Sequence, residues 1–553
     1  MRSVTLRRRM TTCVFNASLV VSLFSFALLA QANFGRILGT VTDQTGAVLP
    51  GAPISIIDKD RGLARSLTTD EAGQYNAPTL IPGTYTVRVE FPGFKTLDRQ
   101  NVVVEVGKEI LVDLTIEAGQ QSETVTVNEA IPLVDTTGAT LGGTLPNVDI
   151  VDMPLNGRNY QNLLNLRPGV VVQPGGGPWT QSTNNVRPDE SGWMVDGIIN
   201  SSFFDARPIV NFPSPLSDMS TILPIDAIQE FNLMENPKAE YGWKPGAVVN
   251  VGIRSGTNAF HGSAYAFGRN GPWDARSVFN PSPQPLLPVE LEQFGGVIGG
   301  PVKKDKLFFF AGYEGLRSLV GNLYIETAPA TARFPTPDPR NSMVDAINAL
   351  QSAGVTPSPI SLKLLGCTLG PTACTGGLIQ GASPNTTTYA STSPTSNISD
   401  NGVAKIDYKI NSKHALSGMV WIGNYLGDGN DHGFVNPIFN LQARVRATDI
   451  VVNWISTPNS RLVNEFRVGY NRVNFISNID DGNILANGSG LTGGKGYPLN
   501  TGVTAVGGLP NINITGFFAA TGSSGIGAGH NRPSSNGPNP FYDFQDNVSY
   551  LRG

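Results

Sequence analysis

The stretch that divides the chain is Ile225–Asn258, IDAIQEFNLMENPKAEYGWKPGAVVNVGIRSGTN. It begins with a short amphipathic turn at Ile225–Phe231, bends at the Gly/Pro-rich segment Tyr241–Gly246, and ends in the alternating segment Val249–Arg254. Apolar residues at every second position predict a half-buried strand, and Ser255–Asn258 predicts the turn that follows it. Short β-rich segments precede this stretch, and long alternating strands rich in glycine and aromatic residues follow it. We interpret it as the boundary between two architectures.

The composition favours an all-β protein. Of 553 residues only 15% are charged, whereas 63 are glycine and 40 are proline. This balance is typical of many strands joined by turns. The formal net charge is −4, and it becomes −8 without the four arginines of residues 1–32. Because phosphate binding needs concentrated basic surface, we expect no nucleic-acid partner.

The first 32 residues have the pattern of a secretory signal peptide. The basic segment Arg7–Arg9 precedes an apolar run at Val14–Ala30, and Ala30-Gln31-Ala32 predicts cleavage after Ala32. An uncleaved membrane anchor is the alternative, although four polar residues interrupt the run. No later segment has the ~20 apolar residues of a spanning helix. We therefore expect any insertion into a membrane to use a β-barrel.

Residues 33–117 predict a β-sandwich, because short segments of strand character alternate with turns. These segments are Ile37–Thr42, Pro53–Asp58, Ala64–Thr68, Gln74–Ala77, Thr84–Glu90, Val102–Val106 and Glu109–Ile116. The sequences GRILGTVTDQTGAVLPGAPI and TTDEAGQYNAPTLIPGTYTVRVEFPGFK resemble the carboxypeptidase regulatory-like domain, which implies a transthyretin-like sandwich of seven strands. The matching turn residues are Asp43, Gly46, Gly51, Asp70, Gly73, Tyr75, Pro82, Gly83, Tyr85 and Gly93. Despite the family's name, we find no catalytic set in this module.

Residues 118–131 form a linker with two interpretations. The linker contains a run of β-prone residues, namely Glu123, Thr124, Val125, Thr126 and Val127. In the first interpretation this run is the last strand of the sandwich, because β-branched residues favour strands. In the second, it is an extended segment that adds a strand to the sheet edge of a partner protein.

Residues 132–258 alternate short apolar segments with Gly/Pro/Asn-rich loops. They contain MPLNGRNYQNLLNLRPGV at 153–170, WMVDGIIN at 193–200 and the dividing stretch at 225–258. In this order the three motifs resemble the plug domain of TonB-dependent outer-membrane receptors, in the Oar-like subgroup with a regulatory-like domain in front. The resemblance implies a globular plug inside a barrel, preceded by a TonB box that recruits an energy-transducing protein. It makes Glu123–Val127 the candidate TonB box, and it places the alternating valines of the dividing stretch inside the plug.

Residues 259–553 predict the first eight strands of a transmembrane antiparallel barrel. The strands are expected at Phe260–Arg269, Gln293–Gly300, Lys306–Leu316, Val403–Ile410, His414–Asn424, Val445–Ile455, Leu462–Arg472 and Phe541–Leu551. Their connections alternate strictly between long and short, which is typical of an outer-membrane barrel with tight periplasmic turns and extended outer loops. A secreted all-β adhesin is the alternative.

Side chains of these strands alternate between two expected faces. In Leu462–Arg472, Phe466 and Tyr470 are expected to face lipid, whereas Glu465 and Arg467 are expected to face the lumen. Five aromatic side chains are expected on the outer face or at strand ends, as interfacial girdles: Phe308, Phe310, Tyr313, Trp421 and Trp454.

Eight strands are too few for the expected barrel. They would close only a narrow barrel, whereas the 22-stranded transporters have a lumen wide enough for a plug. We therefore expect residues 259–553 to be the N-terminal part of a longer barrel, which is truncated in this sequence.

Few residues are arranged for chemistry. Cys367 and Cys374, seven positions apart in CTLGPTAC, predict a local disulfide formed in an oxidising compartment. The four histidines are scattered, and no nucleophile–base set or Walker-type phosphate loop stands out. We therefore expect no enzyme activity, no cofactor and no metal site. Asp428–His432 predicts a solvated turn, with cation binding as the alternative.

These features predict a receptor in the outer membrane of a Gram-negative-type envelope. We expect it to take up a scarce solute, such as a siderophore or an oligosaccharide, with energy from the inner membrane. Its expected partners are a TonB-like protein on the periplasmic side, outer-membrane lipid and the solute itself. The alternative is a surface-exposed adhesion protein, or a carbohydrate- or polymer-binding β protein, that transports nothing.

Overall fold

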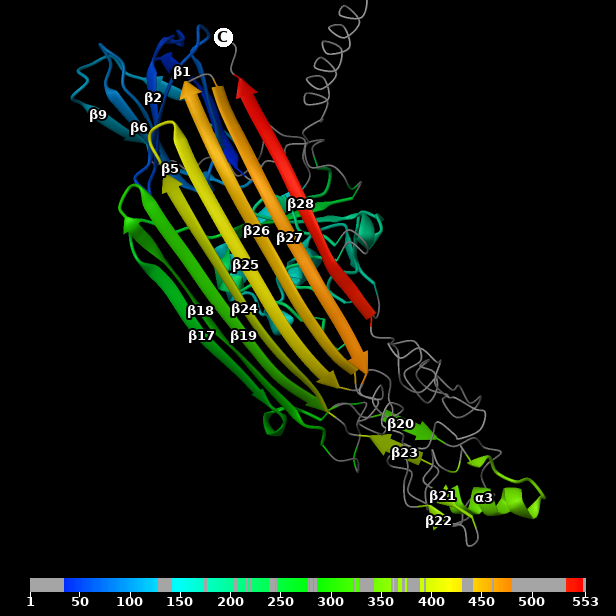
Figure 1. Ribbon diagram of the computed structural model, residues 1–553. Coiled ribbons are helices and arrows are strands. Elements are labelled where there is room, and N and C mark those ends of the chain that lie inside the picture. The colour runs from blue at the N-terminus through cyan, green and yellow to red at the C-terminus, as the bar shows by residue number, and fades with distance from the viewer. Residues whose placement is uncertain are drawn as a thin grey trace, which may run out of the picture.

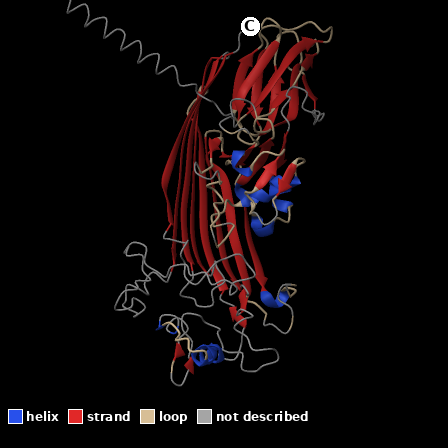
Figure 2. Cartoon of the chain, turned by 90° about the vertical axis from the view of Figure 1, so that its right-hand side faces the viewer, coloured by secondary structure: helices blue, strands red, loops and turns tan. Residues whose placement is uncertain are grey.

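The computed structural model describes residues 34–127, most of 142–321, short pieces between 324 and 391, and 394–429, 441–459, 462–479 and 534–550. Figure 1 shows three parts: a small β-domain, a mixed domain and a long curved sheet. Figure 2 shows the curved sheet from its side, with the mixed domain against one face and the small domain at one end.

No helix among the described residues is long and apolar enough to cross a membrane.

The small domain is a sandwich of two sheets. Its strands are β1 (Gly35–Asp43), β2 (Pro53–Asp58), β3 (Ala64–Thr68), β4 (Gln74–Leu80), β5 (Gly83–Val89), β6 (Thr96–Val104), β7 (Glu109–Leu111), β8 (Leu114–Ile116) and β9 (Thr124–Val127). One sheet has the order β4-β1-β7 with β8 also beside β1, and the other has the order β3-β2-β5-β6-β9. Alternate side chains, such as Ile54 and Ile56 of β2, meet in one apolar core because they share a face of their strand. The predicted sandwich is confirmed.

The mixed domain follows the sandwich in the chain, and we call it the plug. Its elements are β10 (Gly142–Pro146), α2 (Asn147–Asp152), η1 (Asn156–Arg158), η2 (Tyr160–Leu166), β11 (Val170–Val172), β12 (Gln181–Thr183), η3 (Pro188–Glu190), β13 (Gly192–Val195), β14 (Ile198–Ile199), η4 (Ile225–Ala227), β15 (Ile228–Met234) and β16 (Val248–Ile253). Five strands form a sheet in the order β10-β15-β16-β13-β14, and β11 pairs with β12.

The dividing stretch supplies two neighbouring strands of the plug sheet. The expected amphipathic turn is shorter than predicted, because the 3-10 turn η4 passes into strand β15 at Ile228. All six residues of β16 are buried, including Asn250 at 1% exposure. The predicted half-buried strand is therefore wrong in its exposure. β16 lies between β15 and β13, and the plug packs on both of its faces.

The long sheet is antiparallel and follows chain order. Its strands are β17 (His261–Asn270), β18 (Val289–Lys303), β19 (Leu307–Gly321), β24 (Pro394–Lys409), β25 (His414–Gly429), β26 (Leu441–Asn459), β27 (Leu462–Ile479) and β28 (Ser534–Tyr550). Each contains or overlaps one predicted strand. Several begin earlier or end later than predicted, because polar runs such as PTSNISDN in β24 keep the backbone ladder without apolar alternation.

The connections place different structures at the two ends of the long sheet. The long connections carry η6 (Gly271–Trp273), β20 (Tyr324–Thr327), α3 (Met343–Ser352), β21 (Cys367–Thr368), β22 (Ala373–Cys374) and β23 (Thr388–Ser391). In Figure 1 the labelled elements from β20 to β23 lie at the end of the sheet opposite the sandwich. The sandwich contacts the short-turn end, where the Asn258 N–H donates to the Asp60 carbonyl at 2.9 Å.

Three of the five aromatic side chains predicted for the outer face or for strand ends point inward. Phe308, Phe310 and Trp421 are at most 1% exposed, whereas Tyr313 and Trp454 are 42% and 38% exposed. An outer-face position is therefore wrong for the first three, although Phe308 and Phe310 do lie near the start of β19. Alternation defines two faces of a strand but does not say which is apolar, and here a packed domain covers the inner face. The expectation for β27 agrees with the structure, since Glu465 and Arg467 are buried and Phe466 is exposed.

Candidate functional site

The candidate TonB box forms the edge strand β9 of the sandwich. β9 pairs in parallel with β6, and Thr124 lies opposite Thr96. The Thr96 N–H donates to the Glu123 carbonyl at 2.9 Å, and the Lys95 ammonium lies 3.3 Å from the Glu123 carboxylate. The structure thus agrees with the first interpretation of this segment, as the last strand of the sandwich. Its role as a TonB box stays a prediction.

Alternate residues of β9 direct their backbone groups toward β6 and toward the outer edge of the strand. Because the Thr96 N–H bonds to the Glu123 carbonyl, the Glu123 carbonyl and the backbone groups of Val125 and Val127 face β6 in a parallel ladder. The N–H groups of Thr124 and Thr126 therefore point to the free edge. The Val125 and Val127 side chains pack against the sandwich core. Such an edge can accept one further strand by backbone hydrogen bonding.

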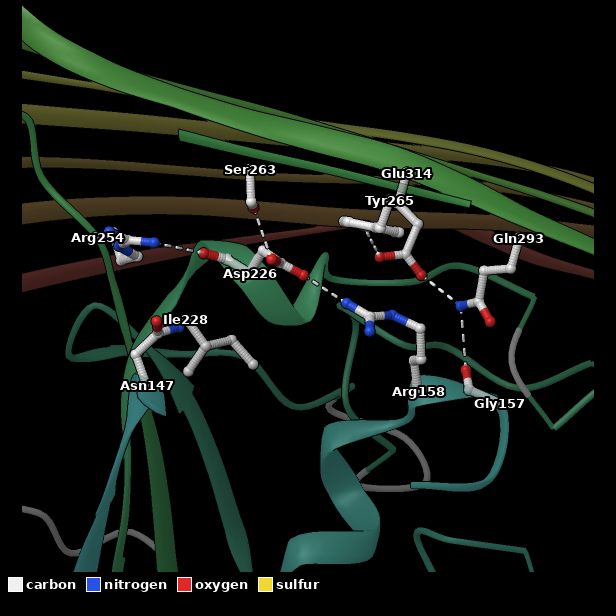
Figure 3. A network of polar contacts seen from close by, with 10 residues as sticks. All are labelled: Asn147, Gly157, Arg158, Asp226, Ile228, Arg254, Ser263, Tyr265, Gln293 and Glu314. Carbon is white, nitrogen blue, oxygen red and sulfur yellow. Dashed lines mark hydrogen bonds and ion pairs between the residues drawn. The ribbon is translucent and has the colours of Figure 1, made fainter. Parts of the chain in front are cut away.

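The plug meets the long sheet through buried polar contacts, and the first of these is centred on Asp226 (Figure 3). Arg158 of the plug donates to Asp226 Oδ2 at 2.5 Å, and Ser263 Oγ of β17 donates to Asp226 Oδ1 at 2.7 Å. Arg254 donates to the Asp226 carbonyl at 3.4 Å. One carboxylate oxygen is thus held by the plug and the other by the sheet.

A second buried carboxylate lies beside this group, on β19. Glu314 accepts hydrogen bonds from Tyr265 and from Gln293, both at 2.5 Å. Gln293 also donates to the Gly157 carbonyl of the plug at 3.2 Å, as Figure 3 shows. The Arg158 guanidinium lies 4.3 Å from the centre of the Tyr265 ring, in range of a cation–π interaction. These contacts join the plug to three strands of the sheet.

The third contact is an ion pair between the plug and β24. Asp196 and Gly197 form the tight turn between β13 and β14, with φ values of +46° and +77°. This turn presents the Asp196 carboxylate to Lys405, whose ammonium lies 2.8 Å from Oδ2 and 2.9 Å from the Ile253 carbonyl. The Ile253 N–H donates to Asp196 Oδ1 at 2.8 Å. Both charges are therefore compensated although both side chains are buried.

Strands β26 and β27 hold the same part of the plug by hydrogen bonds. Asn200 donates to Asp449 at 2.9 Å, and Arg467 donates to the Gly197 carbonyl at 3.1 Å. Asn471 of β27 donates to the Ile199 carbonyl. We call these contacts of the plug with the long sheet, made at Gly157, Asp226, Asp196, Gly197, Ile199 and Asn200, the plug seat. Because water can replace such hydrogen bonds at small net cost, the plug can leave this seat and return to it.

Apolar contacts add to this seat. Phe212 of the plug packs on Phe475 of β27, with ring centres 6.2 Å apart. The Trp421 indole N–H donates to the Ile222 carbonyl at 3.3 Å, and its ring is fully buried. One apolar core therefore extends from the plug into the wall of the long sheet.

The sandwich contacts the plug at Glu230, a buried carboxylic acid on β15. The Val106 N–H donates to Glu230 Oε1 at 2.8 Å, and Asn232 Nδ2 donates to the Val106 carbonyl at 3.3 Å. Burial raises the pKa of Glu230 to about 8; the Val106 N–H and Lys405 oppose this rise, while Glu105 and Asp196 add to it. Glu230 is therefore mostly neutral at pH 7.

We expect the docking of the sandwich on the plug to weaken as pH rises. Separation would expose Glu230 and return its pKa to about 4.5, so the docked state binds the proton more tightly. The stabilisation of docking by the Glu230 proton is complete below about pH 4.5 and is lost above about pH 8. Between these values the equilibrium constant for docking falls by up to about tenfold per pH unit. The docked fraction can be measured in subdenaturing urea by energy transfer between two dyes. One dye is attached to Thr45→Cys in the sandwich and the other to Lys413→Cys in the turn between β24 and β25.

The matched control for this prediction is Glu230→Gln, which keeps an acceptor for the Val106 N–H but cannot titrate. The variant should lose the pH dependence between pH 5 and 8. An equal pH dependence in the variant would assign the effect to another group.

The other predicted site residues have different outcomes. Cys367 is disulfide-bonded, and its backbone pairs directly with that of Cys374 in the β21–β22 ladder. The signal peptide and its cleavage after Ala32 lie outside the described residues, as does most of Asp428–His432. Among the described residues, no group of three or more His, Cys, Asp or Glu side chains is placed to hold a metal ion.

The sequence predicted a lumen-facing position for Arg467 but did not single out Arg158, Asp196 or Lys405. Arg158 and Asp196 lie inside the motifs LNGR and WMVDG, and Lys405 lies in the predicted strand Val403–Ile410. For Asp196 the available signal was a charge inside the otherwise apolar motif WMVDG. It could not pair the residues, because Asp196 and Lys405 are far apart in sequence and meet only in the folded plug.

Comparison with protein families identifies the family of two parts of the chain. A family described as outer membrane beta barrel domain matches residues 252–553, and carboxypeptidase regulatory-like domain matches residues 36–117. The first match covers more than half of the chain. The chain therefore belongs to the outer-membrane β-barrel domain family, with a carboxypeptidase regulatory-like domain in front. The predicted resemblance is confirmed.

The chain is also similar to individual proteins over part of its length. The chain is 29% identical over 308 residues to the TonB-dependent transporter Oar of Myxococcus xanthus, covering 53% of this chain and 27% of Oar. Among solved structures it is similar to the outer membrane transporter YddB of Escherichia coli, with TM-score 0.41 and 12% identity, covering 62% of this chain and 40% of YddB. The ferric enterobactin receptor PfeA of Pseudomonas aeruginosa gives TM-score 0.37 and 12% identity, covering 61% and 41%. The chain thus spans less than half the length of these relatives.

Proposed function

We propose that this protein is an outer-membrane receptor that takes up a scarce solute, such as a siderophore or an oligosaccharide. In this proposal a TonB-like partner supplies energy from the inner membrane by pulling on Glu123–Val127. The observation that carries the proposal is the plug seat. A separate domain lies against the inner face of the barrel sheet, where Ser263, Gln293 and Lys405 of the sheet bind it through polar contacts.

The position of β9 supports the route of energy input. The sandwich lies at the short-turn end of the sheet, which is the periplasmic end in an outer-membrane barrel. β9 therefore lies on the side from which an inner-membrane partner approaches. The described elements of the longest connections, α3 and β20 to β23, lie at the other end, where a solute from outside would arrive.

Uptake of labelled ferric siderophores and labelled oligosaccharides tests the proposal. We expect accumulation in cells that contain the inner-membrane energiser and a loss of at least tenfold in cells that lack it. The control is the same strain without this protein. Equal uptake with and without the energiser would contradict energy coupling.

Adhesion without transport is the second candidate. The long connections support it, since they carry small β-pairs and the helix α3 at the outer end. The sandwich does not support it, because it lies at the opposite end of the sheet. Adhesion through the outer loops predicts surface attachment that survives deletion of Glu123–Val127, whereas energised uptake would not survive it.

A further inference from the structure

The sandwich and the first strand of the plug hold the same neighbouring strand. β10 pairs with β15, so that Thr144 lies opposite Asn232. Asn232 Nδ2 donates to Thr144 Oγ1 at 2.8 Å and to the Val106 carbonyl of the sandwich at 3.3 Å. Glu230, two residues earlier on β15, accepts the Val106 N–H at 2.8 Å. The turn after β6, with Val106 at its centre, is thus bonded to β15 beside β10; we call it the Val106 turn.

β10 is the part of the plug that a pull would reach first. It follows β9 in the chain and forms an edge of the plug sheet, and among the described residues it has a partner strand on one side only. A load applied at β9 that passes along the chain into the plug therefore acts on the β10–β15 pair. Because edge strands are bound along one side, peeling β10 from β15 is the least costly way to begin opening the sheet.

Two cavities show that the rest of the contact between the sandwich and its neighbours is incompletely filled. Arg61, which is paired with Asp58 at 2.6 Å, lines a cavity of about 70 Å³ together with Lys405 and Asp407. A second cavity of about 130 Å³ separates the sandwich from the turn Lys409–Ala415. Contacts around such cavities lose fewer packing interactions on separation than a close-packed core does, because atoms that face a void have no partner there.

We propose that the sandwich is a releasable latch on the plug. The Val106 turn bonds Asn232, which also bonds Thr144 of β10, at the place where a pull would open the plug sheet. β9 belongs to the sandwich sheet, so a load on β9 acts on the sandwich before the chain carries it to β10, and the turn leaves first. The latch rests on the proposed energy input at β9 and adds an order of events: undocking first, opening of the plug second.

Constant-force pulling on the full chain in a lipid bilayer tests the order. The handle is attached to Thr126→Cys, which is exposed on β9, and we expect two successive extension steps. Glu230→Leu leaves the Val106 N–H buried without an acceptor. It should shorten the lifetime of the docked state, which ends at the first extension step, roughly tenfold. Thr144→Val removes only the hydroxyl that accepts from Asn232 inside the plug. It should shorten only the waiting time before the second extension step. Glu230→Gln, which keeps the acceptor, should retain the first step at pH 7.

The outcomes separate the latch from the function on which it rests. An unchanged first step in Glu230→Leu, with a shortened second step in Thr144→Val, would overturn the latch and leave energy input at β9 intact. A load on Thr126 that never extends the plug would overturn energy input at β9, and the latch with it. Equal shortening of both steps by both variants would also overturn the latch, since it would show a single opening event.

Discussion

Lys405→Ala is expected to destabilise the seated plug by about 3–5 kcal/mol, because it leaves the Asp196 carboxylate buried without its partner cation. Lys405 also donates to the Ile253 carbonyl, so the substitution removes the link between β24 and the last plug strand as well. Urea unfolding of the purified full chain in lipid, followed by tryptophan fluorescence, measures the loss.

Two further variants separate the ion pair from general damage. The double variant Asp196→Asn/Lys405→Met carries no uncompensated charge and should recover at least half of the lost stability, since buried pairs can often be replaced by neutral groups. Lys413→Ala, at an exposed lysine of the same sheet, should change stability by less than about 0.5 kcal/mol. A Lys405→Ala variant as stable as Lys413→Ala would show that the pair does not hold the plug.

Thr126→Pro is expected to weaken binding of the energy-transducing partner at least about tenfold. The Thr126 N–H points to the free edge of β9, so proline removes a donor that an added strand would use and places its ring against that strand. Loss of one such bond with the steric conflict corresponds to roughly 1.4 kcal/mol or more. Titration calorimetry with the soluble domain of a TonB-like protein measures the affinity, and energised uptake should fall in parallel.

The neighbouring position supplies the contrast for Thr126→Pro. Val125 directs its N–H toward β6, so Val125→Pro should damage the sandwich itself and lower its melting temperature, whereas Thr126→Pro should leave that temperature nearly unchanged. Thr126→Ala keeps the N–H and should bind the partner normally. Normal binding by Thr126→Pro would mean that the partner does not pair with this edge of β9.

The sequence alone determined the strands and their order. Apolar alternation and turn residues located all eight strands of the long sheet. A period of two is a local property of any strand that has one face buried more than the other. The alternation of long and short connections then predicted antiparallel neighbours in chain order, which the structure shows. The same local signals located the sandwich, whose turns depend on residues such as Gly46 and Gly73 with positive φ.

Only the tertiary structure decided which residues meet and which face is covered. Trp421 has the sequence pattern of a lipid-facing girdle residue, yet it is buried because the plug covers the inner face of β25. Asp226 gathers Arg158, Arg254 and Ser263 from separate segments, and Val106 meets Asn232 across two domains. No local pattern encodes such pairs, because a side chain's burial and partners depend on what the folded chain brings against it.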